Sequence, residues 1–394
     1  MCNQTTKPVE FIMPPITVIG SGAIRELPER LVAIQGTKPL VVTDKGMTAL
    51  GVTATIVGIL EKAGMACAVY DETVPNPTDK NVEAGLAAYV AHGCDSIITL
   101  GGGSAHDCGK GIGLVATNGG RIHDYEGVNK SHARMPSFIA INTTAGTASE
   151  MTRFCIITDS VRKVKMTIVD RRVTPRLAMD DPDLMLGLPP GLTAATGLDA
   201  LTHAIEAFVS TDATHMTDAN AEKAIKLIAK YLRRAVGNGR NVEAREAMCY
   251  AQYQAGMAFN NAGLGYVHAM AHQLGGYLNL PHGECNAILL PYVCEFNMIA
   301  CMDRFAEMAD LLGVKEGART QREMALNVIK AIRDLMDDVA IPPSLTALAA
   351  KYGKTVNPED FVMMAENAMK DACAATNPRR MSMENIIAIY QAVL

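Results

Sequence analysis

The 394-residue chain lacks the features of exported and membrane-spanning proteins. Its ten cysteines form no C-x-x-C pair, so we expect reduced thiols that fill small apolar spaces. Charge-free apolar stretches, such as residues 49–60, are too short to cross a bilayer. The first fifteen residues show no basic region followed by an apolar core. These absences predict a cytoplasmic protein without a membrane partner.

An excess of basic charge is missing as well. The formal net charge is −5 and no basic stripe is present, which argues against a nucleic acid as partner. Hydrophobic residues make up 49% and charged residues 20%, values typical of a soluble globular enzyme. The length exceeds what one hydrophobic core usually supports, so we expect two domains.

The first domain, residues 1–188, is predicted to be an α/β domain. Short apolar runs alternate there with amphipathic segments, a pattern that indicates a parallel sheet covered by helices. The run at 96–103 does not alternate polar and apolar residues, as expected for a strand buried on both faces. The predicted strands are residues 39–44, 66–71, 96–103, 137–144, 153–159 and 177–181.

The second domain, residues 189–394, is predicted to be all helical, because apolar residues recur there at i, i+3, i+4 and i+7. The junction at 181–191 contains three prolines and two glycines, which fits a domain boundary. Thr193 is the expected N-cap of the first long helix after it.

Side chains in this helical half have the chemistry of a metal site. Asp199 and His203 lie four residues apart on a predicted helix and therefore share a face. A single histidine is more often structural, but four candidates lie close together in a chain with nine histidines. Three imidazoles and one carboxylate suit a first-row divalent ion. The candidate ligands are Asp199, His203, His268 and His282, and His272 repeats the four-residue spacing after His268.

A glycine-rich turn follows the predicted strand at 96–103. Without Cβ atoms its backbone can approach a phosphate, and the helix that begins there offers free N–H donors. The turn matches neither the usual dinucleotide fingerprint nor a P-loop. Its residues are Gly101, Gly102, Gly103 and Ser104.

Two further segments are candidates for the same cofactor. Asp44 ends a predicted strand, where its carboxylate can accept from ribose hydroxyls and repel a 2′-phosphate, which favours NAD over NADP. An ordinary turn-forming aspartate is the alternative. Thr143, Thr144 and Thr147 bring hydroxyls to the end of another strand, where they either bind the cofactor or cap the next helix.

Together these segments resemble the iron-dependent (group III) alcohol dehydrogenases along essentially the whole chain. Within that family the sequence is most similar to the bacterial NAD-dependent methanol dehydrogenases. The resembling motifs are PNPT at 75–78, GGGSxxD at 101–107, TTAGTASE at 143–150, ATGLDALTHAIEA at 195–207, GxxHAMAHxLG at 265–275 and PHGxxNA at 281–287.

The resemblance implies a dehydroquinate synthase-like architecture with a cleft between an NAD-binding domain and a helical metal-binding domain. It implies that Asp199, His203, His268 and His282 hold the ion, usually Fe²⁺, although this ligand set does not itself exclude Zn²⁺ or another divalent metal. It makes His272 a catalytic residue, with a structural role as the alternative.

The resemblance also implies residues around the cofactor and substrate. Phe259 is expected to face the substrate. Phe154 stands where some relatives place an asparagine that contacts the nucleotide, which puts that contact in doubt. A homo-oligomer, from a dimer up to a decamer, and an activator protein are the partners it suggests. The residues implied for NAD are Asp44, Asn76, Gly101 to Ser104, Thr143, Thr144, Thr147 and Lys165.

The expected activity is oxidation of short-chain primary alcohols to aldehydes, and the reverse reduction. A divalent ion lowers the pKa of an alcohol oxygen, and nicotinamide accepts the hydride. Diol, lactaldehyde and glycerol dehydrogenases of the same family are alternatives. Sugar-phosphate cyclases are disfavoured because residues 260–290 contain no lysine or arginine to hold a phosphorylated substrate. A non-catalytic metal-binding scaffold is the alternative outside the enzyme classes.

Overall fold

The computed structural model describes residues 8–394, which form two compact units. Residues 12–187 make up an α/β unit, and residues 188–394 make up a helical unit. Residues 8–11 group with the helical unit, whereas we expected them in the α/β domain. None of the described helices is long and apolar enough to cross a membrane.

The α/β unit is built on a six-stranded sheet in which all strands are parallel. Three of its six strands are buried along their whole length, among them the strand at 96–101, which explains why this run does not alternate. Because the strands are parallel, their carboxyl ends meet at one edge of the sheet. Their order is β1 (Ile16–Ile19), β9 (Leu177–Asp180), β6 (Ser137–Asn142), β4 (Ser96–Gly101), β2 (Pro39–Val42) and β3 (Ala68–Tyr70).

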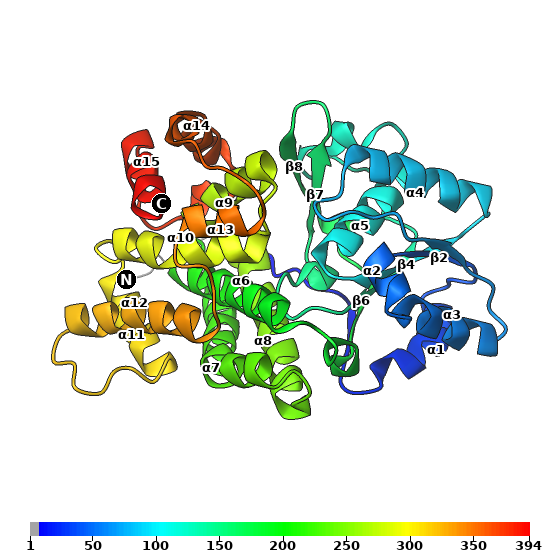
Figure 1. Ribbon diagram of the computed structural model, residues 1–394. Coiled ribbons are helices and arrows are strands. Elements are labelled where there is room, and N and C mark those ends of the chain that lie inside the picture. Colours follow the sequence, from blue (N-terminus) through cyan, green and yellow to red (C-terminus); the bar gives the residue numbers. More distant parts are fainter. Residues whose placement is uncertain (1–7) are drawn as a thin grey trace. The chain divides into compact units, whose positions relative to one another are not determined.

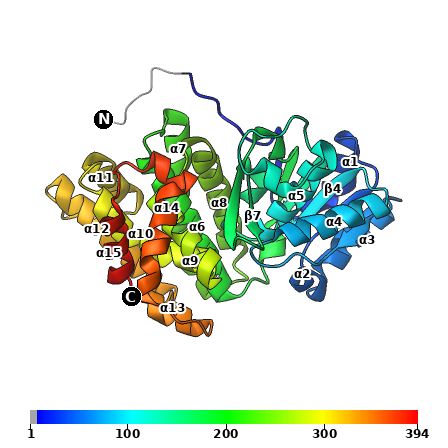
Figure 2. The same cartoon turned by 90° about the horizontal axis from the view of Figure 1, so that it is seen from above.

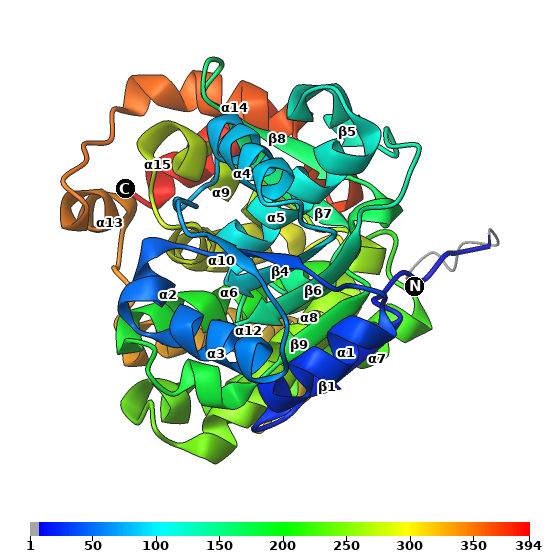
Figure 3. The ribbon, with the colours of Figure 1, turned by 90° about the vertical axis from the view of Figure 1, so that its right-hand side faces the viewer.

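Helices cover both faces of this sheet (Figure 3). On one face α4 (Asp79–Ala91) and α5 (Gly103–Asn118) bury apolar side chains against the strands. On the other face α1 (Leu27–Ala33) and α3 (Val52–Lys62) do the same. The short helix α2 (Lys45–Ala49) follows directly after β2. The predicted α/β class is therefore confirmed.

One strand prediction was wrong about its partner. The run at 153–159 forms β7 (Phe154–Asp159), which pairs antiparallel with β8 (Val164–Val169) in a separate sheet beside α5 (Figure 1). The third strand there is β5 (Gly127–Val128). Burial along β7 alternates residue by residue, as it does when only one face of a sheet is covered.

The helical unit contains the ten α-helices that the structure describes after residue 188 (Figure 2). The first three pack against one another, and α10 packs on α6 and α9. The helices are α6 (Pro190–Val209), α7 (His215–Gly237), α8 (Val242–Ala262), α9 (Tyr266–Leu278), α10 (His282–Asn297), α11 (Met302–Leu311), α12 (Gln321–Asp338), α13 (Leu345–Lys351), α14 (Phe361–Lys370) and α15 (Met383–Ala392).

The predicted cap of α6 was wrong. The helix begins at Pro190, whose fixed φ suits the first helical position, and Pro189 occupies the N-cap. Thr193 lies inside the first turn, where its hydroxyl donates to the Pro189 carbonyl at 3.1 Å. The same hydroxyl accepts a hydrogen bond from buried Arg245 at 2.7 Å, so Thr193 joins α6 to α8.

Candidate functional site

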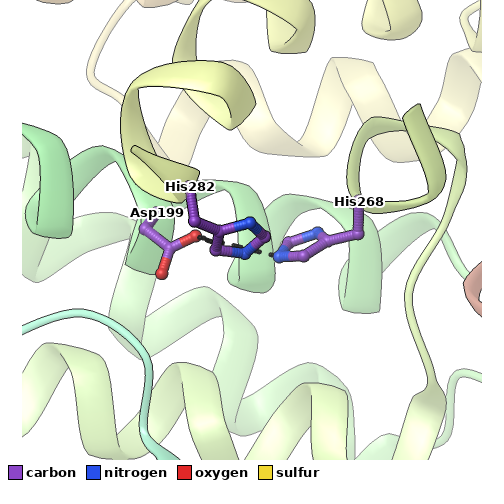
Figure 4. A group of neighbouring side chains, drawn as sticks. All are labelled: Asp199, His268 and His282. Carbon is purple, nitrogen blue, oxygen red and sulfur yellow. Dashed lines mark ion pairs between the residues drawn. The ribbon is translucent and has the colours of Figure 1, made fainter. Parts of the chain in front are cut away.

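Three of the four predicted metal ligands converge inside the helical unit. Asp199 comes from α6, His268 from α9, and His282 is the first residue of α10 (Figure 4). The Nε2 atoms of His268 and His282 lie 3.8 and 3.6 Å from Asp199 Oδ1. One ligand atom from each residue lies within 4.8 Å of the others. Helix packing therefore assembles a carboxylate and two imidazoles from segments far apart in the sequence.

Glycine at position 283 allows α10 to begin this close to α6. A Cβ atom on Gly283 would lie 2.4 Å from the backbone carbonyl oxygen of Ala195. A backbone atom cannot turn aside as a side chain can, so any larger residue would push the start of α10 away. The glycine thus brings His282 within reach of Asp199.

Asn286 lies at the point where the three ligand atoms converge. Its Nδ2 atom is 2.7 Å from Asp199 Oδ1 and 3.1 Å from the Nε2 atoms of both His268 and His282. An amide nitrogen has two N–H groups for these three acceptors. A divalent cation at this point would be bound by all three. The residues present fit a metal ion.

Glu206 fixes the orientation of His268. Its Oε2 atom is 2.5 Å from His268 Nδ1, and its Oε1 atom accepts from the Val267 N–H at 2.8 Å. With its Nδ1 proton donated to Glu206, His268 turns the Nε2 lone pair toward Asp199, as metal-binding histidines do. Burial raises the pKa of Glu206 to about 8, and a bound cation would favour the charged carboxylate. Our sequence reasoning missed Glu206, although it follows His203 by three residues on one helix.

His203, the fourth predicted ligand, lies beside this cluster but outside the group of converging atoms. Its ring is stacked between Phe259 at 4.2 Å and His268 at 4.5 Å between ring centroids. Its Nδ1 atom is 4.0 Å from Asp199 Oδ2. Phe259, on α8, is buried against this ring. The metal role of His203 and the substrate role of Phe259 both stay predictions.

His272 is held by a carboxylate that the sequence did not reveal. Its Nδ1 atom is 2.8 Å from Asp371 Oδ2, and its ring stacks on His282 at 5.4 Å. Burial alone would raise the pKa of Asp371, but His272 and the Cys373 N–H hold it below its usual value. Cys373 lies within reach of the same pair, and burial raises the pKa of its thiol well above normal.

In the α/β unit, the glycine-rich turn and the threonine segment lie in contact. The Thr143 N–H donates to the Gly101 carbonyl at 3.0 Å. A Cβ atom on Gly102 would lie 3.0 Å from the Thr144 hydroxyl, and one on Gly103 would lie 3.1 Å from Thr147. The absence of Cβ atoms keeps the backbone of the turn open next to these hydroxyls. The Thr143 hydroxyl itself is buried without a hydrogen-bond partner in residues 8–394.

Helix α5 begins at this turn, with Gly102 as its N-cap and Ser104 in its first turn. Its first N–H groups have no helical partners, and the positive end of the helix dipole lies here, which suits a phosphate. The four predicted turn residues and the three threonines thus form one cradle at the carboxyl ends of β4 and β6.

Asp44 has a structural role, but as a helix cap and not in the ordinary turn that we considered as the alternative. It caps α2, and its Oδ1 atom accepts from the Met47 N–H at 3.0 Å. Its Oδ2 atom lies 3.6 Å from the position of a Cβ on Gly101, which puts the carboxylate beside the turn. A cap uses one oxygen, so the capping role and the predicted ribose contact are compatible.

The remaining predicted cofactor residues belong to the small sheet and the loop next to it. Asn76 adopts a left-handed φ of 54°, and its carbonyl is 3.5 Å from the Thr158 hydroxyl. Thr158 on β7 pairs with Lys165 on β8. Phe154, the departure from the family pattern, begins β7. The NAD contacts of Asn76 and Lys165 stay predictions.

A buried network that the sequence did not reveal joins α5 to the segment that follows the three threonines. The Lys110 ammonium donates to the Phe154 carbonyl at 2.7 Å and to the Ser149 hydroxyl at 3.2 Å. The same hydroxyl donates to the carboxylate of Asp107 at 2.8 Å. Burial lowers the pKa of Lys110 and raises that of Asp107, which is why each needs these partners. Charged residues inside an apolar helix pattern were the available signal.

The α/β unit has a glycine-rich turn that suits the phosphates of a nucleotide, and the helical unit has converging histidine and aspartate side chains that suit a metal ion. This combination is typical of a metal-dependent dehydrogenase. The chain belongs to the iron-containing alcohol dehydrogenase family. The model of that family matches residues 14–182, and the model of its C-terminal domain matches residues 193–394. The predicted family, fold class and enzyme class are confirmed, and the family name agrees with the predicted iron.

Individual relatives match over nearly the whole chain. The 1,3-propanediol dehydrogenase of Klebsiella pneumoniae is 47% identical over 97% of this chain and 98% of its own. The NAD-dependent methanol dehydrogenase of Bacillus methanolicus is 45% identical over 98% and 99%. The solved structure of an alcohol dehydrogenase from Oenococcus oeni is 45% identical and covers 98% of this chain and 100% of its own, with a TM-score of 0.93.

Proposed function

We propose that this protein is an NAD-dependent dehydrogenase of short-chain primary alcohols, from methanol to butanol, and that it also reduces the corresponding aldehydes. The observation that carries the proposal is the convergence of Asp199, His268 and His282 on one point, with His203 stacked beside them. These four residues would hold the divalent ion. NAD as cofactor is supported by the methanol dehydrogenase relative and by the cradle of the α/β unit.

When bound, the divalent ion supplies Lewis acidity that lowers the pKa of the alcohol, and NAD accepts the hydride. The chain's own residues orient the metal-binding side chains and accept the alcohol proton. Glu206 holds the tautomer of His268, and Asn286 lies against the three ligand atoms. His272 receives the alcohol proton, and Asp371 holds its ring through Nδ1.

Asp44 is the residue proposed to select NAD over NADP. A 2′-phosphate next to its carboxylate would meet like-charge repulsion. Asp44→Gly should admit NADP, because it removes the charge beside Gly101. A variant that gains no NADP-dependent activity would assign the discrimination to another residue.

Phe259 is proposed to limit the size of the substrate. Its ring stacks on His203, one of the proposed metal ligands, so Phe259 would form a wall of the pocket next to the metal. A second substituent on the reacting carbon would then collide with this wall. Methanol offers no alkyl chain to bury, whereas each buried CH₂ contributes about 0.8 kcal/mol. We therefore expect kcat/KM for methanol to be well below that for ethanol, propan-1-ol or butan-1-ol, and secondary alcohols to be poor.

A diol is the second candidate substrate, because a 1,3-propanediol dehydrogenase and a lactaldehyde reductase are among the relatives, at 47% and 40% identity. A substrate panel decides between the two. We would measure kcat/KM with NAD for methanol, propan-1-ol, propan-2-ol, propane-1,2-diol and propane-1,3-diol, with Fe²⁺ and with Zn²⁺. A preference for a diol would replace the simple-alcohol assignment, and equal rates for the two propanols would contradict the small pocket.

We further propose a cytoplasmic homo-oligomer, from a dimer up to a decamer. Light scattering of the purified protein measures the assembly. Assays with and without a candidate activator protein test whether turnover depends on one.

A further inference from the structure

A small cavity in the α/β unit is lined by four arginines. It has a volume of about 110 Å³ and lies between two loops, residues 129–136 before β6 and residues 170–176 before β9. Buried Phe138 contributes to its wall. The arginines are Arg134, Arg171, Arg172 and Arg176.

This cavity lies at the opposite edge of the sheet from the cofactor cradle. The cradle follows the carboxyl ends of β4 and β6, whereas the arginines precede the amino ends of β6 and β9. A strand of six residues such as β6 spans roughly 20 Å. The arginines are therefore not part of the cofactor cradle.

Buried hydrogen bonds fix the two loops to each other. The Asp170 carboxylate accepts from both the N–H and the hydroxyl of Ser131, at 2.9 and 2.7 Å. Arg172 donates from its side-chain Nη1 atom to the Ser131 carbonyl at 3.1 Å. The backbone N–H of Arg176 donates to the Phe138 carbonyl at 3.2 Å. The guanidinium of Arg172 is thus held in place with other N–H groups left over. These bonds connect the two loops that form the walls of the cavity.

Positive charge exceeds negative charge along the lining of the cavity. None of the residues that line it is acidic. Within residues 8–394, neither Arg134 nor Arg172 nor Arg176 has a carboxylate partner within ion-pair distance. The Thr174 hydroxyl in the same wall is buried without a hydrogen-bond partner in that part of the chain. Guanidinium groups that line one cavity repel one another, and an oxyanion there would accept hydrogen bonds from their N–H groups.

We propose that this cavity is a binding site for a tetrahedral oxyanion, either free phosphate or the phosphate group of a small monoester. A single water needs about 10–15 Å³ of such volume, so the cavity holds several waters, which is the space that a phosphate group requires. Arg134 and Arg176 are exposed at its mouth, which leaves room for an organic substituent on the phosphate to extend into solvent.

The test measures anion binding with the cofactor cradle filled. Isothermal titration of inorganic phosphate, and separately of glycerol 3-phosphate, is carried out on the metal-loaded protein with saturating NAD and at constant ionic strength. The test variant is Arg134→Gln/Arg176→Gln. The matched control is Arg319→Gln/Arg322→Gln, which removes the same charge from exposed positions at the start of α12.

We expect the wild type and the control to bind alike, and the test variant to bind roughly tenfold more weakly or worse. Binding of phosphate without glycerol 3-phosphate identifies the free ion as the ligand, and binding of both identifies a monoester site. Equal affinity in all three proteins, or equal heat with chloride, means an adventitious ion only and overturns the proposal. A changed oligomer size in the test variant with unchanged phosphate binding also overturns it, because the arginines then hold a neighbouring copy.

Discussion

At the scale of single residues, the proposed metal site depends on three converging ligands and on the side chains that hold them in place. Asp199, His268 and His282 were identified from residue type and motif, and the structure brings their ligand atoms together. Glu206, Asn286 and Asp371 were not identified, because each acts on a histidine through a contact that depends on packing. Asp371 is 99 residues from His272, and no local pattern connects the two.

Mutation of a proposed metal ligand and mutation of Glu206, which holds His268 in place, should reduce metal binding to different extents. His268→Ala removes a proposed ligand and should leave the protein nearly free of iron. Glu206→Gln keeps the ligand but loses the acceptor of its Nδ1 proton, and should weaken metal affinity by roughly 10–100-fold. Elemental analysis and competition with a chelator measure both effects. Glu366→Gln, on the exposed face of α14, is the control for charge removal. A full metal complement in His268→Ala would remove this residue from the ligand set.

His272 is expected to act on the proton and not on the metal. His272→Ala should retain its iron and lose roughly 10²–10⁴-fold in kcat, the usual cost of removing a general acid–base group. Imidazole added to the buffer should restore part of the rate, whereas a merely structural histidine would not be replaced in this way. Loss of iron from the variant would make His272 a ligand and contradict the assignment.

At the scale of elements, the pattern identified runs and periods well but not partners. Residues 153–159 were correctly recognised as a strand, but the strand pairs with β8 in a separate sheet, where its burial alternates. The cap of α6 was misplaced since two prolines already start the helix at Pro190. The close approach of α10 to α6 could not be predicted from the sequence, because a glycine after a histidine does not indicate which backbone it will contact.

The close approach of α10 to α6 can be tested by a substitution at Gly283. In Gly283→Ala the new Cβ meets the Ala195 carbonyl, so α10 must shift, and we expect lost metal together with destabilisation of roughly 1–3 kcal/mol. Gly276→Ala in α9 is the matched control, since nothing lies within 4 Å of its Cβ position. The control should keep its metal and gain about 0.5–1 kcal/mol from helix propensity. Normal metal content in Gly283→Ala would show that α10 tolerates the shift.

A second test concerns the connection between the turn before β2 and the start of β4. Burial would raise the pKa of Asp95, but hydrogen bonds from Ser96, Thr37 and the Lys38 N–H lower it to about 2. A depressed carboxyl pKa stabilises the fold above the unfolded value near pH 4, and this contribution disappears as the pH falls toward 2. Asp95→Asn should therefore be less stable than the wild type at pH 6, and the difference should shrink below pH 4. Urea unfolding at several pH values measures it, and a difference independent of pH would contradict the charge-based explanation.

At the scale of the whole molecule, the two compact units divide the two binding functions between them. All four proposed metal ligands belong to residues 188–394, and the cradle proposed for NAD belongs to residues 12–187. This division was predictable because the change from alternating strands to continuous helices is a property of long stretches, which no single contact decides. A ligand stabilises the structure that binds it, by about 4 kcal/mol at a thousand times its Kd.

Removal of each ligand should therefore loosen a different unit. We expect a chelator to increase amide hydrogen exchange in α6, α9 and the start of α10, because Asp199, His268 and His282 lose their common partner. NAD should slow exchange at residues 101–107 and 143–150, where the glycine turn meets the threonines. Exchange measured by mass spectrometry on the wild type, with Glu206→Gln as a variant of weakened metal affinity, separates the two responses. A chelator that loosens the parallel sheet as strongly as the three helices would contradict this division, because the metal would then stabilise both units as one cooperative structure.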